Sequence, residues 1–223
     1  MKKKTNKSVW CGVEWDAGMQ GMVSFLAAMG VVMVLLTVHH CYNQPKPQPV
    51  PDDISKFIME MEGFSAEPYL LDGVWHIGYG TVVASRVMQS VTVDKAALML
   101  KNRLFEDRLR LSALIPEFNS FPPSVIKATH SAYYNTPALV GPFYRGYLSH
   151  SDWENASNEL AWGHTPKQYY GLVVRRVKEA NLIREDMGIP LLNTPASLEA
   201  FQQVKEEWCK HRDDIVPWSG PIQ

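Results

Sequence analysis

Apolar residues recur with helical spacing just after a proline-rich stretch of the chain. Four of them fall at i, i+3, i+4 and i+7: Ile54, Phe57, Ile58 and Met61. This spacing places them on one face of a short helix over residues 52–62. Asp52 or Asp53 is placed to cap the helix start, and Gly63 to end the helix in left-handed backbone.

The pattern then changes from helical to extended. Two apolar runs, residues 69–71 and 74–77, flank the pair Asp72-Gly73. An Asp-Gly pair between two such runs predicts a β-hairpin with a two-residue turn. Gly78 and Gly80 follow, and without side chains they leave the backbone open to close approach.

Beyond the hairpin the pattern is helical to the end of the chain. The predicted helices start after cap residues or prolines and run over residues 92–114, 122–135, 151–162, 165–187 and 194–211. The predicted fold class is therefore α+β, with a small β-hairpin lobe packed on a mostly helical lobe. We expect this domain to cover residues 52–190 and a helical extension to cover residues 191–223.

Residues 22–38 interrupt this picture because they carry no charge over 17 positions. As a helix they span about 26 Å, close to the ~30 Å of a hydrocarbon core. A buried core helix and a cleaved signal are the alternatives, but the run has no polar face and the residues that follow it form a poor cleavage site. We expect one N-terminal transmembrane helix, a signal anchor.

The flanking segments give the anchor an orientation. Residues 1–21 hold four lysines and form a predicted cytoplasmic tail, so the body is expected on the far side of the membrane. Residues 39–51 form a proline-rich linker, a stiff spacer between membrane and body. The expected location is a bacterial inner membrane, crossed once, with the C-terminal domain in the periplasm.

Charge and composition exclude some classes of function. The formal charge is −1 overall, but residues 1–41 carry net +2 and the rest 18 basic against 21 acidic residues. An acidic body argues against nucleic-acid binding, which needs a basic face. The seven histidines show no metal-ligand spacing, and no nucleotide-binding motif is present. No metal and no cofactor is expected.

Glu62 is the first candidate for chemistry. It is the last residue of the predicted 52–62 helix, where the negative end of the helix dipole disfavours a charged carboxylate. A carboxyl group that can hold a proton is what a general acid needs. The ordinary alternative is a solvated residue at a helix end.

Three stretches resemble one family. Glu-Gly-Phe starts at residue 62, Gly-Val-Trp-His-Ile-Gly-Tyr-Gly covers residues 73–80, and Gly-Leu-Val-Val-Arg-Arg-Val-Lys-Glu-Ala covers residues 171–180. Together with Ala-Tyr-Tyr-Asn at residues 132–135, they resemble the T-even phage-type lysozymes of glycoside hydrolase family 24, many of which are phage endolysins. The resemblance implies a lysozyme-like fold, with Glu62 as general acid.

The same resemblance leaves the second catalytic group open. The family places an Asp or Cys nine residues after the Glu, where this chain has Leu71, followed by Asp72. Where the family has Thr, this chain has His76. Asp72 is either a plain turn residue or the partner of Glu62. His76 is either a cross-strand partner of Tyr69 or a group that activates water or attacks the sugar.

Other residues are expected around the site. One of Arg175 and Arg176 is expected to pair with Glu62. Aromatic and amide side chains stack on sugars and hydrogen-bond to them, so four residues are candidates to line a sugar-binding cleft, with burial in the core as the alternative: Trp75, Tyr79, Tyr133 and Asn135.

The resemblance implies a membrane-anchored muramidase that hydrolyses the β-1,4 bond between N-acetylmuramic acid and N-acetylglucosamine in peptidoglycan. The alternatives are a non-catalytic peptidoglycan-binding module and a membrane-tethered structural protein that keeps only the fold. Of the three cysteines, Cys11 is expected in the reducing cytoplasm. A Cys41–Cys209 disulfide is then the only intramolecular pairing that this topology permits; the alternative is a Cys209 packed as a small hydrophobe.

Overall fold

The computed structural model describes residues 8–10, 13–15, 49–84, 89–163 and 170–215, and the chain divides into two units, Met1–Pro47 and Gln48–Gln223. In the first unit, β1 (Ser8–Trp10) and β2 (Val13–Trp15) pair antiparallel. The predicted span, residues 22–38, lies outside the described residues. Within the ranges that are described, none of the helices is both long and apolar enough to cross a membrane.

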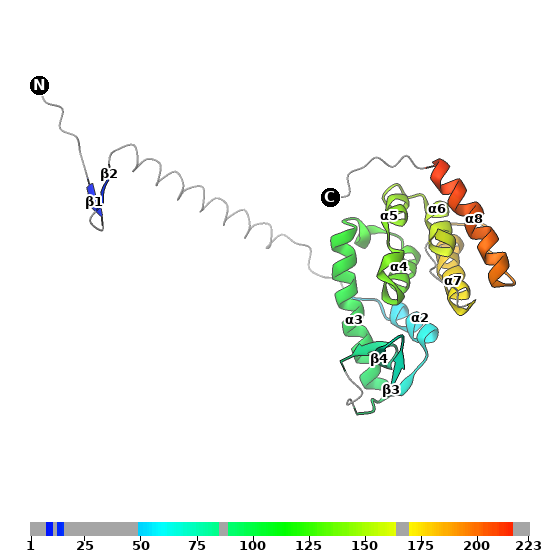
Figure 1. Ribbon diagram of the computed structural model, residues 1–223, viewed down its shortest axis with the longest axis horizontal. Coiled ribbons are helices and arrows are strands. Elements are labelled where there is room, and N and C mark those ends of the chain that lie inside the picture. Colours follow the sequence, from blue (N-terminus) through cyan, green and yellow to red (C-terminus); the bar gives the residue numbers. More distant parts are fainter. Residues whose placement is uncertain (1–7, 11–12, 16–48, 85–88, 164–169, 216–223) are drawn as a thin grey trace, which may run out of the picture. The chain divides into compact units, whose positions relative to one another are not determined.

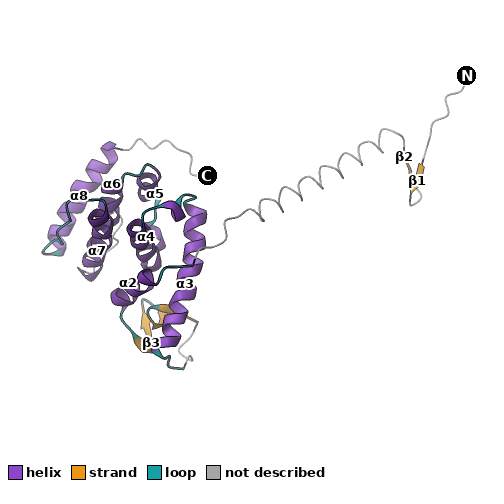
Figure 2. Ribbon diagram, turned by 180° about the vertical axis from the view of Figure 1, so that it is seen from behind, coloured by secondary structure: helices purple, strands orange, loops and turns teal. Residues whose placement is uncertain are grey.

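The second unit combines a small sheet with helices, as the α+β prediction requires (Figures 1 and 2). Its elements are α2 (Asp52–Glu62), β3 (Ser65–Leu71), β4 (Val74–Gly78), β5 (Thr81–Val83), α3 (Val93–Leu114), α4 (Pro123–Asn135), α5 (Pro142–Ser149), α6 (Trp153–Asn158), α7 (Tyr170–Asp186) and α8 (Leu198–Ile215). Short 3₁₀ turns, η1 (Phe118–Ser120) and η2 (Pro137–Leu139), and a π turn, η3 (Glu159–Gly163), complete it.

The sheet extends the predicted hairpin by one strand. Strands β3 and β4 are joined by Asp72-Gly73, whose φ angles of 49° and 79° are both positive, as a type I′ turn requires. Strand β5 adds to the far side of β4 and was missed, because three residues carry too little alternation to predict a strand. A Cβ on Gly78 would lie 2.8 Å from the Cβ of Ala96, so this glycine lets the sheet approach α3.

The ends of α2 differ from the prediction. Pro51 is the residue before the helix, and no side chain caps it. Asp52 and Asp53 lie in the first turn, where Asp52 pairs with Lys101 and Asp53 with Lys127, each at 2.8 Å. The predicted cap was wrong because ion pairs with α3 and α4 hold both carboxylates. Gly63 has a positive φ of 70°, but its ψ of 171° lies outside the left-handed helical region that was predicted.

The other helix starts were predicted with mixed success. Thr92 caps α3 by accepting a hydrogen bond from the backbone N–H of Lys95 at 3.3 Å, and Pro123 starts α4. The last helix was expected from Thr194, but α8 starts at Leu198, where the Ser197 hydroxyl accepts from the Ala200 backbone N–H. The helix predicted over residues 151–162 starts as expected, because Asp152 accepts a hydrogen bond from the Asn155 backbone N–H at 3.2 Å, but its second half is the π turn η3 rather than α-helix.

The core centres on α4, which contacts α2, α3 and α7 (Figure 1). Eight of its thirteen residues are buried. The sheet packs against one end of α3, and α2, which leads into β3, packs against α3 and α4. The body therefore places the C-terminal end of α2 between the sheet on one side and α4 and α7 on the other.

The C-terminal extension is packed onto the helices. Phe201 of α8 is fully buried, and Trp208 donates its indole N–H to the Glu159 carboxylate at 2.9 Å. The Arg212 guanidinium lies 4.1 Å from the centre of the Phe143 ring. Cys209 on the same helix is half-buried and makes no disulfide with another described residue. Cys41 lies outside the described residues, so the Cys41–Cys209 bridge stays a prediction.

Candidate active site

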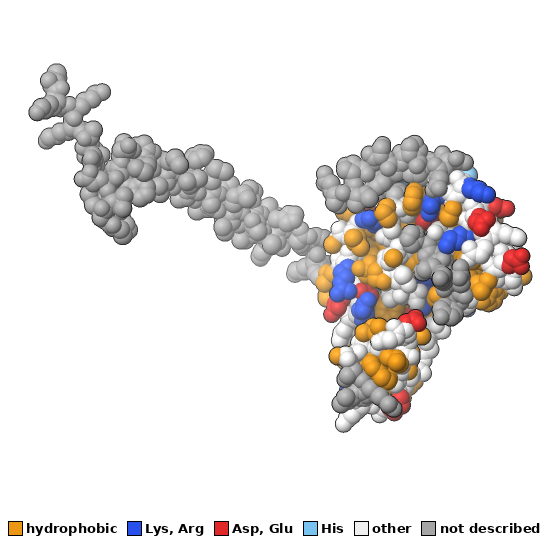
Figure 3. Space-filling model, viewed as in Figure 1, with side chains coloured by type: hydrophobic (Ala, Val, Ile, Leu, Met, Phe, Trp, Pro, Cys, Tyr) orange, Lys and Arg blue, Asp and Glu red, His pale blue; other side chains and the backbone are white. Residues whose placement is uncertain are grey.

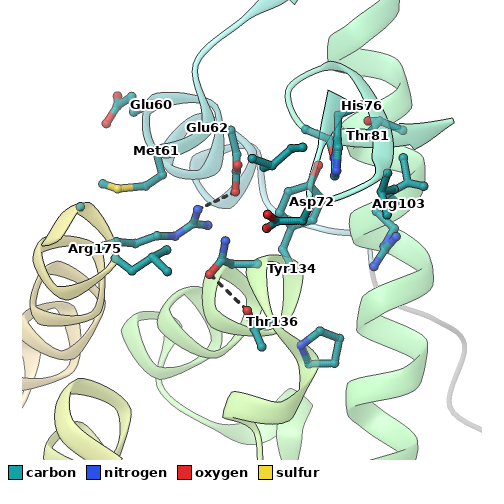
Figure 4. A pocket seen from close by; sticks show the side chains of 18 of the residues that line it. Glu60, Met61, Glu62, Asp72, His76, Thr81, Arg103, Tyr134, Thr136 and Arg175 are labelled. Atoms are coloured by element: carbon teal, nitrogen blue, oxygen red, sulfur yellow. Dashed lines mark hydrogen bonds and ion pairs between the residues drawn. The ribbon is translucent and has the colours of Figure 1, made fainter. Parts of the chain in front are cut away.

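A cavity of about 880 Å³ opens between the sheet and the helices (Figure 4). Residues from α2, the three strands, α3, the end of α4 and α7 line it. It brings together four of the seven catalytic and sugar-cleft candidates, Glu62, Asp72, His76 and Asn135, and with them Arg175. They come from separate elements, so only the folded chain assembles them.

Glu62 lies at the C-terminal end of α2 and points into this cavity (Figure 4). Its carboxylate accepts a 2.6 Å hydrogen bond from Nη1 of Arg175, and the side chains are 17% and 8% exposed. The expected Arg–Glu62 pair is confirmed. Gly80 closes one side: a Cβ there would lie 3.2 Å from Glu62 Oε2, so a residue with a side chain would crowd the carboxylate.

Arg175 is held from behind by a second carboxylate. Its Nε donates to Glu179 Oε1 at 3.0 Å, and Arg176 donates to the same oxygen at 2.9 Å. The Ser131 hydroxyl adds a third hydrogen bond to that oxygen, at 2.5 Å. Burial lowers the pKa of Arg175, but the carboxylates of Glu179 and Glu62 outweigh burial, and the net pKa is raised. Arg175 therefore stays charged and faces Glu62 as a fixed cation.

His76 lies in the middle of β4, opposite Tyr69, as the sequence suggested. The two rings stack with centroids 5.6 Å apart and planes 23° apart. The imidazole Nδ1 lies 3.1 Å from the backbone oxygen of Gly80. Burial raises the pKa of Tyr69, and the negative charge of Glu62 raises it further, so the stacked ring stays a neutral phenol.

Asp72 lies at the tip of the β3–β4 turn, where it is exposed and has a left-handed φ of 49°. It lines the cavity from the hairpin side, opposite α4 and α7. In Figure 4 the carboxylates of Asp72 and Glu62 both point into the cavity. The position of Asp72 fits both of its readings, as a turn residue and as a second carboxylate.

The other three sugar-cleft candidates do not line the cavity. Tyr79 and Tyr133 are buried in the core at 9% and 8% exposure, the alternative given for them above. Trp75 lies between Val74 and His76 on β4. Neighbouring residues on a strand face opposite ways, so the Trp75 side chain points away from the face that carries His76. Asn135 lines the cavity, and its side-chain oxygen accepts from the Thr136 hydroxyl at 3.4 Å.

Several lining residues were missed by the sequence reasoning. Tyr134 donates its hydroxyl to the backbone oxygen of Tyr79 at 2.6 Å, which ties α4 to the loop before β5. Arg103 lies over the Tyr134 ring at 5.8 Å and makes two 2.9 Å hydrogen bonds to the buried Asp107. The i, i+4 spacing of Arg103 and Asp107 was visible in the sequence, but nothing local pointed this pair at the cavity.

Part of the sheet side of the cavity is apolar. Leu71, Val74 and Val82 line it while remaining 54%, 42% and 54% exposed. Figure 3 shows hydrophobic side chains gathered on the lobe that carries the sheet. The sheet side thus combines these aliphatic groups with the polar Asp72 and His76, whereas the helix side carries charged and amide groups. In the described part of the chain, no three acidic, cysteine or histidine side chains gather in a way that suits a metal ion.

Comparison with solved structures gives three matches at low sequence identity. The active form of the P1 phage endolysin Lyz matches with a TM-score of 0.53 and 18% identity, over 70% of this chain and 94% of that chain. The muramidase domain of SpmX from Asticaccaulis excentricus (TM-score 0.52, 21% identity) matches over 60% and 96%. The endolysin from Escherichia coli O157:H7 phage FAHEc1 (TM-score 0.52, 21% identity) matches over 66% and 99%. These matches establish the shared fold.

The sequence itself gives a family match. No curated protein matches the chain, but the family model described as phage lysozyme matches residues 59–179. The matched stretch starts just before Glu62, covers the sheet and the cavity, and ends at Glu179 behind Arg175. It spans more than half of the sequence, and the chain belongs to the phage lysozyme family.

Proposed function

We propose that the protein is a muramidase that hydrolyses the β-1,4 bond between N-acetylmuramic acid and N-acetylglucosamine in peptidoglycan. Glu62 is the general acid and gives its proton to the leaving glycosidic oxygen. Water attacks the anomeric carbon and loses a proton to a base on the sheet side. The observation that carries this proposal is the position of Glu62, between Arg175 and Gly80 in the cavity, within the stretch that matches the family.

The cavity offers two bases, Asp72 and His76. An inverting glycosidase places acid and base about 6.5–9.5 Å apart with water between them, whereas a retaining one places a nucleophile at about 5–5.5 Å. The apolar wall of Leu71, Val74 and Val82 suits the methyl groups and ring faces of N-acetylated sugars, and Asn135 offers an amide to their polar groups.

The test is hydrolysis of purified peptidoglycan by the full-length protein in mild detergent. We expect the wild type to release reducing ends and Glu62→Gln to lose at least about 10²-fold in rate, since general acids contribute on that scale. Glu60→Gln is the matched control, because Glu60 lies on the same helix and lines the same cavity but is exposed. Full activity of Glu62→Gln would refute the proposal.

A binding module is the second candidate, favoured by one observation. Leu71 occupies the position where the family places its second acid, and the neighbouring Asp72 lies exposed at a turn. In that case the wild type sediments with purified peptidoglycan but releases no reducing ends. The same assay therefore separates the two candidates.

We also propose that residues 22–38 anchor the protein in a bacterial inner membrane, with the catalytic body in the periplasm and the linker holding it off the bilayer. The uncharged run of 17 residues and the four lysines before it support this proposal. Deleting residues 22–38 should move the protein from the membrane fraction to the soluble fraction. Retention of the deleted form at the membrane would refute the anchor.

A further inference from the structure

His76 is held more rigidly than the other candidate base. It lies in the middle strand of the sheet, paired with Tyr69 on β3 and with Val82 on β5. Its ring is stacked on Tyr69 and half-buried. Asp72 instead lies exposed at the tip of the hairpin. A group that must meet a reacting atom works best on a rigid element with its side chain fixed by neighbours.

The hydrogen bond at Nδ1 fixes which nitrogen of His76 carries the proton. The partner is the backbone oxygen of Gly80 at 3.1 Å, and a carbonyl oxygen only accepts hydrogen bonds. Nδ1 is therefore the donor. In the neutral ring this leaves the lone pair on Nε2, the nitrogen able to take a proton.

Gly80 connects this imidazole to the general acid. Its oxygen accepts from His76, and its Cα lies so close to Glu62 that an added Cβ would stand 3.2 Å from Oε2. Gly80 thus lies beside both candidate catalytic groups and lines the cavity with them. Acid and imidazole are held against one backbone segment, the loop between β4 and β5.

The charges around His76 balance. The titratable and charged groups that line the cavity with it are Glu60, Glu62, Tyr69, Asp72, Arg103, Tyr134, Arg175 and Lys178. Three are carboxylates, three are cations and two are phenols. Arg175 is paired with Glu62 and Arg103 with Asp107, so neither directs an unpaired positive charge at the imidazole.

We propose that His76 is the base that activates the attacking water, through Nε2, and that Asp72 is not required for this step. The inference rests on the proposed muramidase function. Nε2 takes a proton from water as the water oxygen bonds to the anomeric carbon. The bond from that carbon to the glycosidic oxygen breaks, and that oxygen takes the Glu62 proton. The imidazolium then returns its proton to the carboxylate through solvent, and the sugar product has the inverted configuration.

The test compares single substitutions in the full-length protein in mild detergent, on soluble peptidoglycan oligosaccharides. His76→Asn keeps an N–H able to donate to the Gly80 oxygen but lacks Nε2, and should lose about 10²- to 10⁴-fold in kcat. His76→Gln keeps an amide near the Nε2 position and should be equally impaired. Asp72→Asn should lose less than about 10-fold. Wild-type kcat for either His76 variant, or loss in Asp72→Asn alone, would overturn the inference.

His150→Asn is the matched control. Its Nδ1 also lies near a backbone oxygen four residues away, that of Gly146 at 2.9 Å, but it is exposed and outside the cavity. We expect it to have wild-type kcat. Thermal unfolding of every variant tests that it is folded, and Glu62→Gln runs in parallel. If Glu62→Gln is inactive while His76→Asn is active, only this inference fails; an inactive wild type refutes the proposed function as well.

Two further readouts separate a base from a structural role. The wild-type pH profile of kcat/KM should fall on its acid side as the base becomes protonated, and the residual activity of His76→Asn should lack that limb. A limb unchanged in the variant would overturn the inference. Proton NMR of the first product should show the inverted α-anomer. A first product with retained β-configuration would also overturn it, since retention requires attack by a group other than the activated water in the first step.

Discussion

Glu179 is the centre of a buried ionic network behind the cavity, and the structure allows the effect of its removal to be worked out. Its Oε1 accepts hydrogen bonds from Ser131, Arg175 and Arg176, all on buried side chains. Glu179 is fully buried and Arg176 is 1% exposed. Burial is also the main cause that lowers the pKa of Arg176, to about 10. The network therefore holds two guanidinium groups in the interior around one carboxylate.

Glu179→Gln keeps the size and one acceptor oxygen of the side chain but removes its charge. Arg175 retains Glu62 as a partner, whereas Arg176 is left without any carboxylate that it contacts in the native fold. Removing one partner of a buried ion pair costs about 3–5 kcal/mol, and the retained oxygen places this case near 3 kcal/mol. For a protein of this size that corresponds to a fall of roughly 6–12 °C in Tm.

The assay is urea unfolding followed by tryptophan fluorescence, with Glu185→Gln as control. Glu185 lies on the same helix but is exposed, and its substitution should change stability by less than about 0.5 kcal/mol. Arg176→Met should cost less than Glu179→Gln, because it removes the cation and leaves Glu179 paired with Arg175. If Glu179→Gln unfolds at the same urea concentration as the control, the argument from buried charge is wrong.

Three further predictions concern packing, ionisation and covalent structure. Gly78→Ala places a Cβ 2.8 Å from that of Ala96 at a φ of +65°, and should cost about 1–3 kcal/mol in urea unfolding. Burial, with a smaller contribution from the charge of Glu62, raises the pKa of Tyr134 to about 12 from an ordinary 10. Its contribution to stability is thus complete below pH 10 and lost as pH rises toward 12, and Tyr134→Phe should flatten that part of a pH–Tm curve. In oxidised full-length protein, Cys41 and Cys209 should resist thiol labelling until a reductant is added; labelling of both without reduction excludes the bridge.

Local signals in the sequence were sufficient where one short segment determines its own structure. The Asp72-Gly73 pair specified its turn because few residues adopt two successive positive φ angles. Thr92 and Pro123 marked helix starts for equally local reasons, a side-chain cap and a ring already set at the helical φ. These elements place the sheet and the two long helices that flank the cavity.

Local signals failed where a distant part of the chain decides. Asp52 and Asp53 are good cap residues, yet Lys101 and Lys127, both far along the chain, hold their carboxylates. Strand β5 consists of three residues and exists because β4 offers it a free edge. The helix predicted from Thr194 starts later, since Tyr170 of α7 donates its hydroxyl to the Pro195 oxygen and keeps that segment extended.

The candidate site shows the same division. The family resemblance sufficed to predict that an arginine meets Glu62. It left open which has the larger effect on that carboxylate, the end of the α2 dipole or the guanidinium. The structure adds a third participant, Glu179, which draws on the same arginine from the side away from the cavity. Arg175 therefore divides its hydrogen bonds between two carboxylates. Glu179 helps to hold the guanidinium that Glu62 meets, although Glu179 does not contact Glu62 itself.

That dependence gives the acid a setting that no single contact provides. No cation at all would leave the end of α2 without a group to orient the side chain. An arginine shared with Glu179, itself held by Ser131 and Arg176, fixes the position of the Glu62 carboxylate. Because these partners come from α2, α4 and α7, the position of the acid's side chain depends on how the helices pack and not only on the motif around Glu62.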